Sequence, residues 1–264
     1  MLESKSKNIR RLRKKWDERA KNYDEWYKTF KGAVEHYVDW ELLKENLPKQ
    51  RMARVLDAAG GTGRITFILA KMGYSVTLCD ISCEMLNVAK RKLLKAGIID
   101  RVRILGCDVN KLPFSDESFD FVLCWDGMVE AIKELVRVTK RHGIMSVFLV
   151  NRCREAIDLF SENPALALKL MNARAHYIDD DEEMYKVTSV EEARDLFEIS
   201  GTKVLNTYAV CGWLNKLSIP EKVLESQKWD EKYLNQVSRM VLRLAKEPSI
   251  QGLSRHLVVY AEKI

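Results

Sequence analysis

The stretch that decides the fold is Arg54-Val-Leu-Asp-Ala-Ala-Gly-Gly-Thr-Gly63, followed by a second apolar run that ends in Asp80. A short apolar segment comes first, three glycines follow, and apolar residues then recur at helical spacing from Ile65 to Met72. Residues 75–80 resume a strand pattern. This order predicts a strand, a glycine turn, a helix and a second strand, which is a βα unit of the nucleotide-binding type.

The glycine turn is suited to a polar ligand. Glycine has no Cβ, so the backbone can approach a ligand closely, and the first N–H groups of the helix point into the same space. Asp80 follows the turn by about twenty residues, where a carboxylate can accept both hydroxyls of a ribose. An ordinary tight connection between strand and helix is the alternative, and the glycines by themselves leave it open.

The residues around the turn disfavour a dinucleotide. The fingerprint Gly-x-Gly-x-x-Gly starting at Gly61 fails at Thr66, and starting at Gly60 it fails at Thr62. Asp57 also ends the first strand directly before the turn, where it would repel a diphosphate and suit a cationic ligand.

The segment Asp57-Ala-Ala-Gly-Gly-Thr-Gly63 resembles motif I of the class I S-adenosylmethionine-dependent methyltransferases, Asp-x-Gly-x-Gly-x-Gly. Ala59 stands where the family has its first glycine, and we expect it to hold a negative φ because left-handed backbone is unfavourable for alanine. The resemblance implies S-adenosylmethionine as the cofactor, with its methionine part facing the backbone of Ala59, Gly60 and Gly61.

Two further segments support the resemblance. Residues 106–120 are similar to the family signature Gly-Asp-x-x-x-Leu-Pro-Phe-x-Asp-x-Ser-Phe-Asp, and residues 133–143 resemble Glu-x-x-Arg-Val-Leu-Lys-Pro-Gly-Gly. By this resemblance, Asp80 holds the ribose, Asp108 accepts the adenine amino group and the Val109 N–H meets a ring nitrogen. The cofactor-binding set is Tyr23, Asp57, Ala59, Gly60, Gly61, Asp80, Ile81, Met85, Asp108, Val109 and Cys124, in which Ile81, Met85 and Cys124 form apolar walls.

The residues before the first strand predict two helices and a cap over the site. Apolar residues from Ile9 to Ala20 share one helical face, and an aromatic-rich region follows up to Trp40. Residues 16–24 resemble the opening Phe/Trp-Asp-x-x-Ala-x-x-Tyr-Asp of small-substrate methyltransferases, in which an aromatic residue helps to close over the cofactor. Tyr23 and Tyr37 are therefore candidates for lining the pocket, with ordinary core positions as the alternative.

The net charge of +6 is concentrated in the first fifteen residues, which carry seven basic residues against Glu3. Such a basic arm can attract the phosphates of tRNA or of a membrane surface, and a solvated, partly disordered leader is the alternative. No apolar run is long enough to span a membrane, so we expect a soluble, cytoplasmic protein. The six cysteines include no Cys-x-x-Cys, and we expect no metal site.

The predicted fold class is α/β, a doubly wound Rossmann-like sheet of seven mostly parallel strands. We expect residues 1–50 to form the basic arm and helical cap, and residues 51–264 to form the methyltransferase domain. Residues 151–189 show helical spacing and then an acidic run, which we interpret as a solvated loop or lid. A helical insertion at about 213–252 precedes the last strand, and we expect it above the carboxyl edge of the sheet.

The sequence predicts methyl transfer to an oxygen or nitrogen acceptor on a small molecule or a tRNA. The tRNA alternative draws on a weaker resemblance to the tRNA carboxymethoxyuridine methyltransferases, at Lys31-Gly32 and Glu247-Pro248. A nicotinamide-dependent oxidoreductase and a non-catalytic cofactor-binding module are the other hypotheses. Asp126, His176 and Tyr37 are candidate bases, and the sequence does not decide among them.

Overall fold

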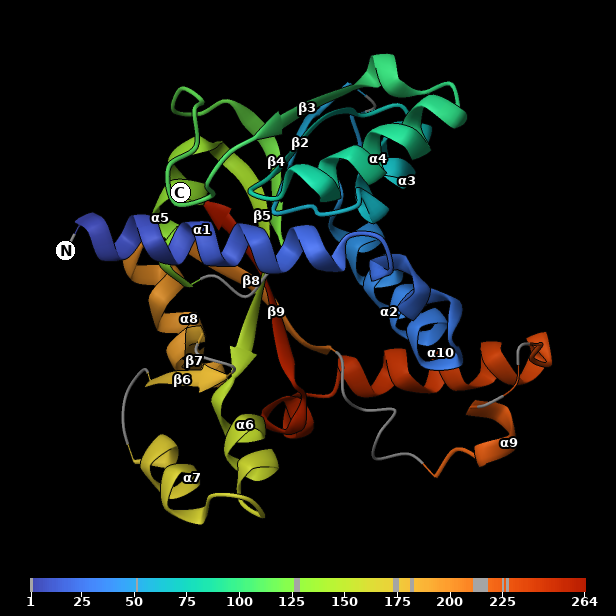
Figure 1. Cartoon of the computed structure of the whole chain (residues 1–264), viewed down its shortest axis with the longest axis vertical. Coiled ribbons are helices and arrows are strands. Elements are labelled where there is room, and N and C mark those ends of the chain that lie inside the picture. The colour runs from blue at the N-terminus through green and yellow to red at the C-terminus, as the bar shows by residue number, and fades with distance from the viewer. Residues whose placement is uncertain are drawn as a thin grey trace.

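The centre of the molecule is a nine-stranded, mostly parallel sheet (Figure 1). This computed structural model describes residues 2–50, 52–125, 129–172, 176–180, 183–210, 218–224, 226 and 228–264. Five strands follow one another in the order β3-β2-β1-β4-β5, and β5 also pairs with β9 and β7. The strands are β1 (Arg54–Ala58), β2 (Ser75–Asp80), β3 (Val102–Gly106), β4 (Phe119–Cys124), β5 (Thr139–Asn151), β6 (His176–Asp180), β7 (Glu183–Thr188), β8 (Thr202–Val210) and β9 (His256–Lys263).

Helices cover both faces of the sheet, as the doubly wound prediction requires. One face packs against α2 (Phe30–Asn46), α3 (Arg64–Met72), α4 (Cys83–Lys95) and α10 (Glu231–Ala245). The other face packs against α5 (Ile132–Val138) and α8 (Val190–Ile199). The remaining helices are α1 (Leu2–Arg19), α6 (Arg152–Leu159), α7 (Pro164–Met171), α9 (Glu221–Leu224) and the 3₁₀ turns η1 (Tyr23–Lys28), η2 (Ile99–Arg101), η3 (Val129–Ala131) and η4 (Pro248–Leu253).

The predicted βα unit is confirmed, and local signals set its boundaries. Gly63 and Gly73, both in the left-handed region, flank α3 at its two ends. Ser82 caps α4 by accepting a hydrogen bond from the Met85 N–H at 3.1 Å. The central strands are buried on both faces, which explains why their sequences are continuous apolar runs.

The basic arm forms a helix, α1, which runs from residue 2 to residue 19. Figure 1 shows α1 lying across the sheet in front of the strands, with α2 following it on the side of α3 and α4. The alternative of a disordered leader is therefore wrong for residues 2–19. The cap is also continuous with the rest of the protein, because Phe30, Val34 and Leu42 of α2 share a core with β1 and α3.

The interpretation of residues 151–189 as helix followed by a loop is wrong at its second half. Asp179, Asp180 and Glu183 of the acidic run belong to the β6–β7 hairpin, which adds two strands to the predicted seven. Strand β5 continues past Val147, the last residue that pairs with β4, so the end of β5 has a free edge. Strand β7 pairs with this edge at Val150–Val187 and Asn151–Thr188.

The segment before the last strand is helical, as predicted, but its main helix lies elsewhere than expected. Helix α10 packs along α2 and β8 on one face of the sheet, with Val241 and Ala245 in the shared core. Phe30 of α2 stacks on Tyr233 with ring centroids 5.9 Å apart. The apolar stripe of α10 is covered in this way, so the helix does not extend across the carboxyl edge.

Candidate functional site

The glycine turn after β1 has one open position. A Cβ added to Gly60 would lie 2.4 Å from Leu78 and 2.6 Å from Asp57, and one added to Gly63 would lie 3.1 Å from Ala89. At Gly61, which has a φ of +54°, the nearest atom would be the Met85 sulfur at 3.9 Å. The turn therefore packs back against β2 and α4 at two glycines and leaves room for a ligand at Gly61.

Asp80 binds the same turn from the end of β2. Its Oδ2 accepts the Gly61 N–H at 2.9 Å, and its Oδ1 accepts the Ser82 N–H at 2.8 Å. The residue is only 7% exposed, and this burial raises the pKa of its carboxyl group. Each carboxylate oxygen can accept a further hydrogen bond, so Asp80 can hold the turn and still bind two hydroxyl groups.

Helix α1 is fastened to the corner between β2 and α4. Arg13 Nε donates to the Ile81 carbonyl at 3.1 Å. Asp17 Oδ1 accepts the Ser82 hydroxyl at 2.6 Å and the Glu84 N–H at 3.1 Å. The N-terminal helix is thus positioned beside Asp80, as the predicted cap requires.

Asp108 lies at the next strand end, as predicted. Its Oδ1 accepts hydrogen bonds from the backbone and side-chain nitrogens of Asn110, each at 2.9 Å. The Cys107 N–H donates to the Asp80 carbonyl at 3.0 Å, which joins the two strand ends directly. Val109 is buried. Contacts of Asp108 and Val109 with an adenine ring stay a prediction.

Asp57 is bonded to the start of α3, and its contact with a cationic ligand stays a prediction. Its Oδ2 accepts the Thr66 hydroxyl at 2.5 Å and the Thr66 N–H at 3.1 Å, and the residue is 3% exposed. Burial raises the pKa of its carboxyl group to about 6. Asp57 thus holds the first turn of α3 from behind the glycines, because a carboxylate beside the free N–H groups of a helix start accepts them.

The prediction that Ala59 holds a negative φ is wrong. Its φ is +54°, and the next residue, Gly60, donates its N–H to the Cys79 carbonyl at 3.1 Å. That bond anchors the turn to β2, and the backbone must enter the left-handed region to make it. For an alanine this conformation costs roughly 1–2 kcal/mol.

The predicted apolar walls occupy the expected elements. Met85 and Cys124 are buried, at the start of α4 and the end of β4, and Ile81 is half-buried. Tyr23 packs edge-on against Trp16 and Tyr27, with ring centroids 6.1 and 6.4 Å apart. It is therefore part of an aromatic cluster that supports the cap.

Only one of the candidate bases has a described side chain. Asp126 and the side chain of His176 lie outside the described residues. Tyr37 packs partly buried against the core of α2 and α3. Within the described part of the chain, no group of three or more side chains is arranged to hold a metal ion.

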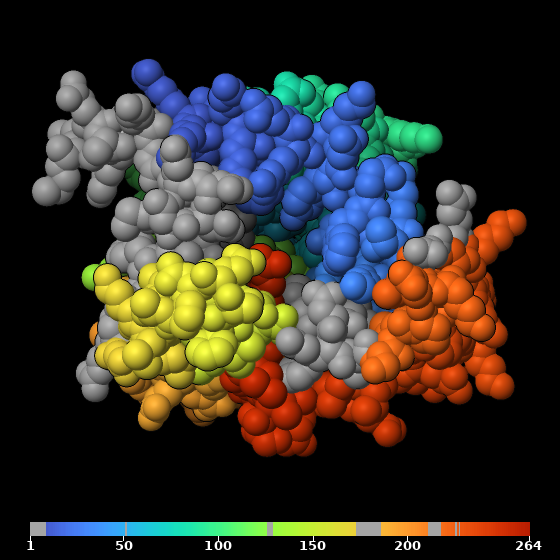
Figure 2. All heavy atoms as spheres, turned by 60° about the horizontal axis from the view of Figure 1, so that its bottom comes forward, coloured from blue at the N-terminus to red at the C-terminus, as the bar shows by residue number. Residues whose placement is uncertain are grey.

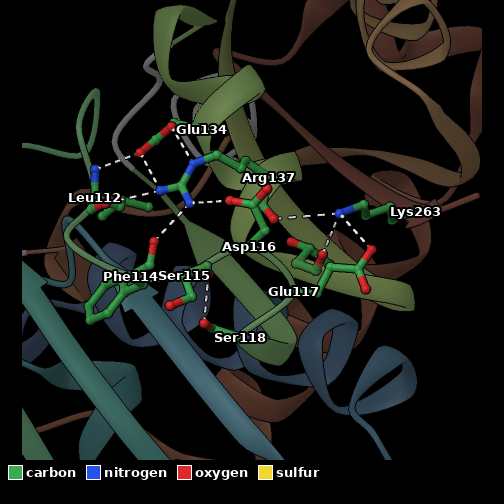
Figure 3. A network of polar contacts seen from close by, with 10 residues as sticks. Leu112, Phe114, Ser115, Asp116, Glu117, Ser118, Glu134, Arg137 and Lys263 are labelled. Atoms are coloured by element: carbon green, nitrogen blue, oxygen red, sulfur yellow. Dashed lines mark hydrogen bonds and ion pairs between the residues drawn. The ribbon is translucent and has the colours of Figure 1, made fainter.

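The signature segment after β3 is held in place by Arg137, a residue that sequence reasoning did not single out (Figure 3). Its guanidinium donates to the carbonyls of Leu112 and Phe114 at 3.0 and 2.8 Å, and to Glu134 and Asp116 at 2.7 Å each. Glu134 in turn accepts the Leu112 N–H at 2.8 Å. Arg137 lowers the pKa of Glu134, which keeps that carboxylate ionised. The Glu-x-x-Arg motif thus shapes the loop behind Asp108.

In the view of Figure 2, α1 and α2 (blue) lie along one side of this face of the molecule and α6–α7 (yellow) lie along the other. Comparison with known proteins finds similarity to one family over the region that contains the glycine turn, Asp80 and Asp108. Residues 55–143 match the family model described as a methyltransferase domain. This part of the chain, about a third of its length, is similar to the methyltransferase domain family.

Curated relatives of this chain include two named "Ubiquinone/menaquinone biosynthesis C-methyltransferase UbiE". The protein from Pseudomonas paraeruginosa is 32% identical over 142 residues, and that from Stutzerimonas stutzeri is 35% identical over 144 residues. Each match covers 50% of this chain and 55% of the relative, so the chain spans about half the length of the curated relatives it matches.

Solved structures share the fold. A methyltransferase from Methanosarcina mazei aligns with a TM-score of 0.56 at 17% identity, over 84% of this chain and 97% of that one. A second, from Aquifex aeolicus, aligns with a TM-score of 0.54 at 19% identity, over 94% and 98%.

S-adenosylmethionine is the cofactor of this family, and the residues present fit it. The open backbone position at Gly61 and the acceptor capacity of Asp80 together suit a nucleoside with free hydroxyls. The described helices include none that is both long and apolar enough to cross a membrane.

Proposed function

We propose that this protein transfers the methyl group of S-adenosylmethionine to an acceptor bound above the carboxyl edge of the sheet. The observation that carries the proposal is the pairing of Asp80 with Gly61, at 2.9 Å, directly beside the open position of the glycine turn. The family match at residues 55–143 covers this same region. It also removes the support for a nicotinamide-dependent oxidoreductase.

The bound cofactor supplies an electrophilic methyl group on a sulfonium, which an acceptor displaces in line. In our proposal Asp80 accepts the ribose hydroxyls, and Asp108 and the Val109 N–H hold the adenine. The backbone of Ala59, Gly60 and Gly61 lies along the methionine part. Ile81, Met85 and Cys124 exclude water from the site, which favours a reaction that depends on positioning.

The acceptor is a small molecule or a tRNA base, with oxygen or nitrogen as the acceptor atom. The printed name of the relatives, C-methyltransferase, adds carbon as a third acceptor atom to test. The tRNA alternative relies on the basic helix α1, in which Arg13 is already bonded to the Ile81 carbonyl. If α1 binds tRNA, affinity should fall steeply with salt, and removal of residues 1–15 should flatten that slope.

Two measurements test the proposal. Calorimetry with S-adenosylmethionine, its demethylated product and NAD should show binding of the first two, and binding of NAD alone would refute the assignment. A labelled methyl-transfer assay should then compare fractionated RNA, extracted metabolites and lipids as acceptors. The absence of transfer to every fraction, with cofactor binding intact, would favour a non-catalytic binding module.

A matched pair of variants connects the activity to the site. Asp80→Asn should abolish most transfer, because it removes a carboxylate oxygen from the ribose side. Asp100→Asn makes the same chemical change at an exposed position in η2 and should leave transfer unchanged.

A further inference from the structure

A second cavity lies away from the carboxyl edge, on the outer side of α3 and α4. It has a volume of about 630 Å³ and is bounded by η1 and α2 on one side and by α3 and α4 on the other. Figure 1 shows these helices together on one side of the sheet. The volume lies within the range of small-molecule sites.

The walls of this cavity combine rings and aliphatic groups with positive charge. Tyr27, Phe67, Ile68 and Ala96 supply apolar surface. Arg64, Lys92 and Lys95 supply three positive charges, against the single carboxylate of Asp24 among the lining residues. Arg64 is paired with Asp39 and Lys92 with Asp24, so Lys95 carries the positive charge that is left over beside the apolar walls. This combination suits an anion with a hydrophobic body.

Arg64 is held rigidly as part of the wall. Its guanidinium lies 4.2 Å above the Tyr27 ring, contacts His36 Nδ1 at 2.7 Å and pairs with Asp39 at 3.1 Å. Burial, with the charge of Arg64, lowers the pKa of His36 to about 4, so this imidazole is neutral at pH 7 and accepts the Arg64 hydrogen. Arg64 therefore keeps Tyr27 in one orientation, which prepares a flat surface for a ring.

Lys95 is the cation most available to a ligand. It lies exposed in the last turn of α4, and within the described part of the chain it forms no ion pair. Lys92, in contrast, is bonded to Asp24 at 2.8 Å, and Asp24 accepts the Thr62 hydroxyl at 2.6 Å. These contacts connect the wall of the cavity to Thr62 of the glycine turn. The lining of the cavity includes none of Gly61, Asp80 and Asp108, so the cavity and the predicted cofactor site occupy different places.

We propose that the cavity between η1, α2, α3 and α4 is a second ligand site, which takes a small molecule carrying an aromatic ring and a phosphate or carboxylate group. The ring packs between Tyr27 and Phe67, and the anionic group lies toward Lys95 and Lys92. The site is distinct from the cofactor edge and does not depend on the methyl-transfer assignment.

Calorimetry with four probes tests the chemistry. Phenyl phosphate and benzoate should bind with dissociation constants on the order of 1 mM, and their ratio decides between phosphate and carboxylate. Inorganic phosphate, without the ring, and benzyl alcohol, without the charge, should each bind roughly tenfold more weakly. Equal binding of all four probes, or no binding of either phenyl phosphate or benzoate at 10 mM, would overturn the proposal.

Variants and competition assign the binding to this cavity. Lys95→Met should weaken phenyl phosphate binding roughly tenfold, and Tyr27→Leu roughly fivefold. Lys90→Met changes an exposed lysine of the same helix that does not line the cavity, and should have no effect. Saturating S-adenosylhomocysteine should leave phenyl phosphate bound. Displacement by it, or equal effects of the two lysine variants, would place the binding elsewhere and refute the site.

Discussion

Asp57→Asn should change how the stability of the protein depends on pH. Burial raises the pKa of Asp57 from its usual 3.8 to about 6 in the folded protein. Between these two values the folded state holds a proton that the unfolded state has lost, so wild-type stability falls as the pH rises through this window. The shift of about 2 units corresponds to about 3 kcal/mol, fully lost above pH 6. Asparagine does not titrate, so the variant lacks this pH-dependent contribution to the free energy of unfolding.

Urea unfolding at pH values from 4 to 8 measures the effect. We expect the stability difference, variant minus wild type, to grow by about 3 kcal/mol over this range. The asparagine oxygen can still accept the Thr66 N–H, so the fold should persist. Asp100→Asn, at an exposed position, gives the control for an ordinary carboxylate. A stability difference that stays constant, or that shrinks as the pH rises, would refute the conclusion that burial raises the pKa of Asp57.

Three further changes test other parts of the structure. Ala59→Gly should stabilise the protein by about 0.5–1 kcal/mol in urea unfolding, because relief of the left-handed strain exceeds the added chain entropy of glycine. Destabilisation would contradict a positive φ at this position. Asp80→Asn should weaken S-adenosylmethionine binding at least thirtyfold by calorimetry, about 2 kcal/mol, because the amide of asparagine cannot accept hydrogen bonds from Gly61, Ser82 and the ribose together. An unchanged affinity would exclude Asp80 from the site. Arg137→Ala should lower the free energy of unfolding by about 2–3 kcal/mol, because it leaves the Leu112 and Phe114 carbonyls without their donor. A loss below about 0.5 kcal/mol would mean that water replaces the hydrogen bonds of Arg137.

The sequence was sufficient for the parts of the fold that local signals determine. The βα unit follows from an apolar run, adjacent glycines and helical spacing, and the start of α4 follows from Ser82, whose side chain caps it. The carboxylates at the ends of β2 and β3 could be placed side by side because neighbouring parallel strands end at one edge. Each of these inferences uses residues close together in the chain or a rule of sheet topology.

Features that depend on the choice of a partner could not be predicted. In the sequence, Thr66 only indicated that the dinucleotide fingerprint is absent. Its hydrogen bond with Asp57 depends on the geometry of the turn, which the sequence does not show. The β6–β7 hairpin depends on how far β5 extends beyond β4, which no local pattern encodes. The position of α10 depended on which of several apolar faces was left uncovered, and the structure assigns it to α2. One signal was available: the spacing of Glu134 and Arg137 permits an ion pair on one helix face.

The attachment of α1 beside Asp80 has a consequence for how this interface can vary among homologues. Of the three hydrogen bonds described above, two end on main-chain atoms, the Ile81 carbonyl and the Glu84 N–H. Substitutions at positions 81 and 84 therefore leave these two bonds available, and within this set of three the side chains of Arg13, Asp17 and Ser82 are the constrained ones. Among these three bonds, correlated substitutions across an alignment would consequently reveal the Asp17–Ser82 pair and miss the two that end on the main chain.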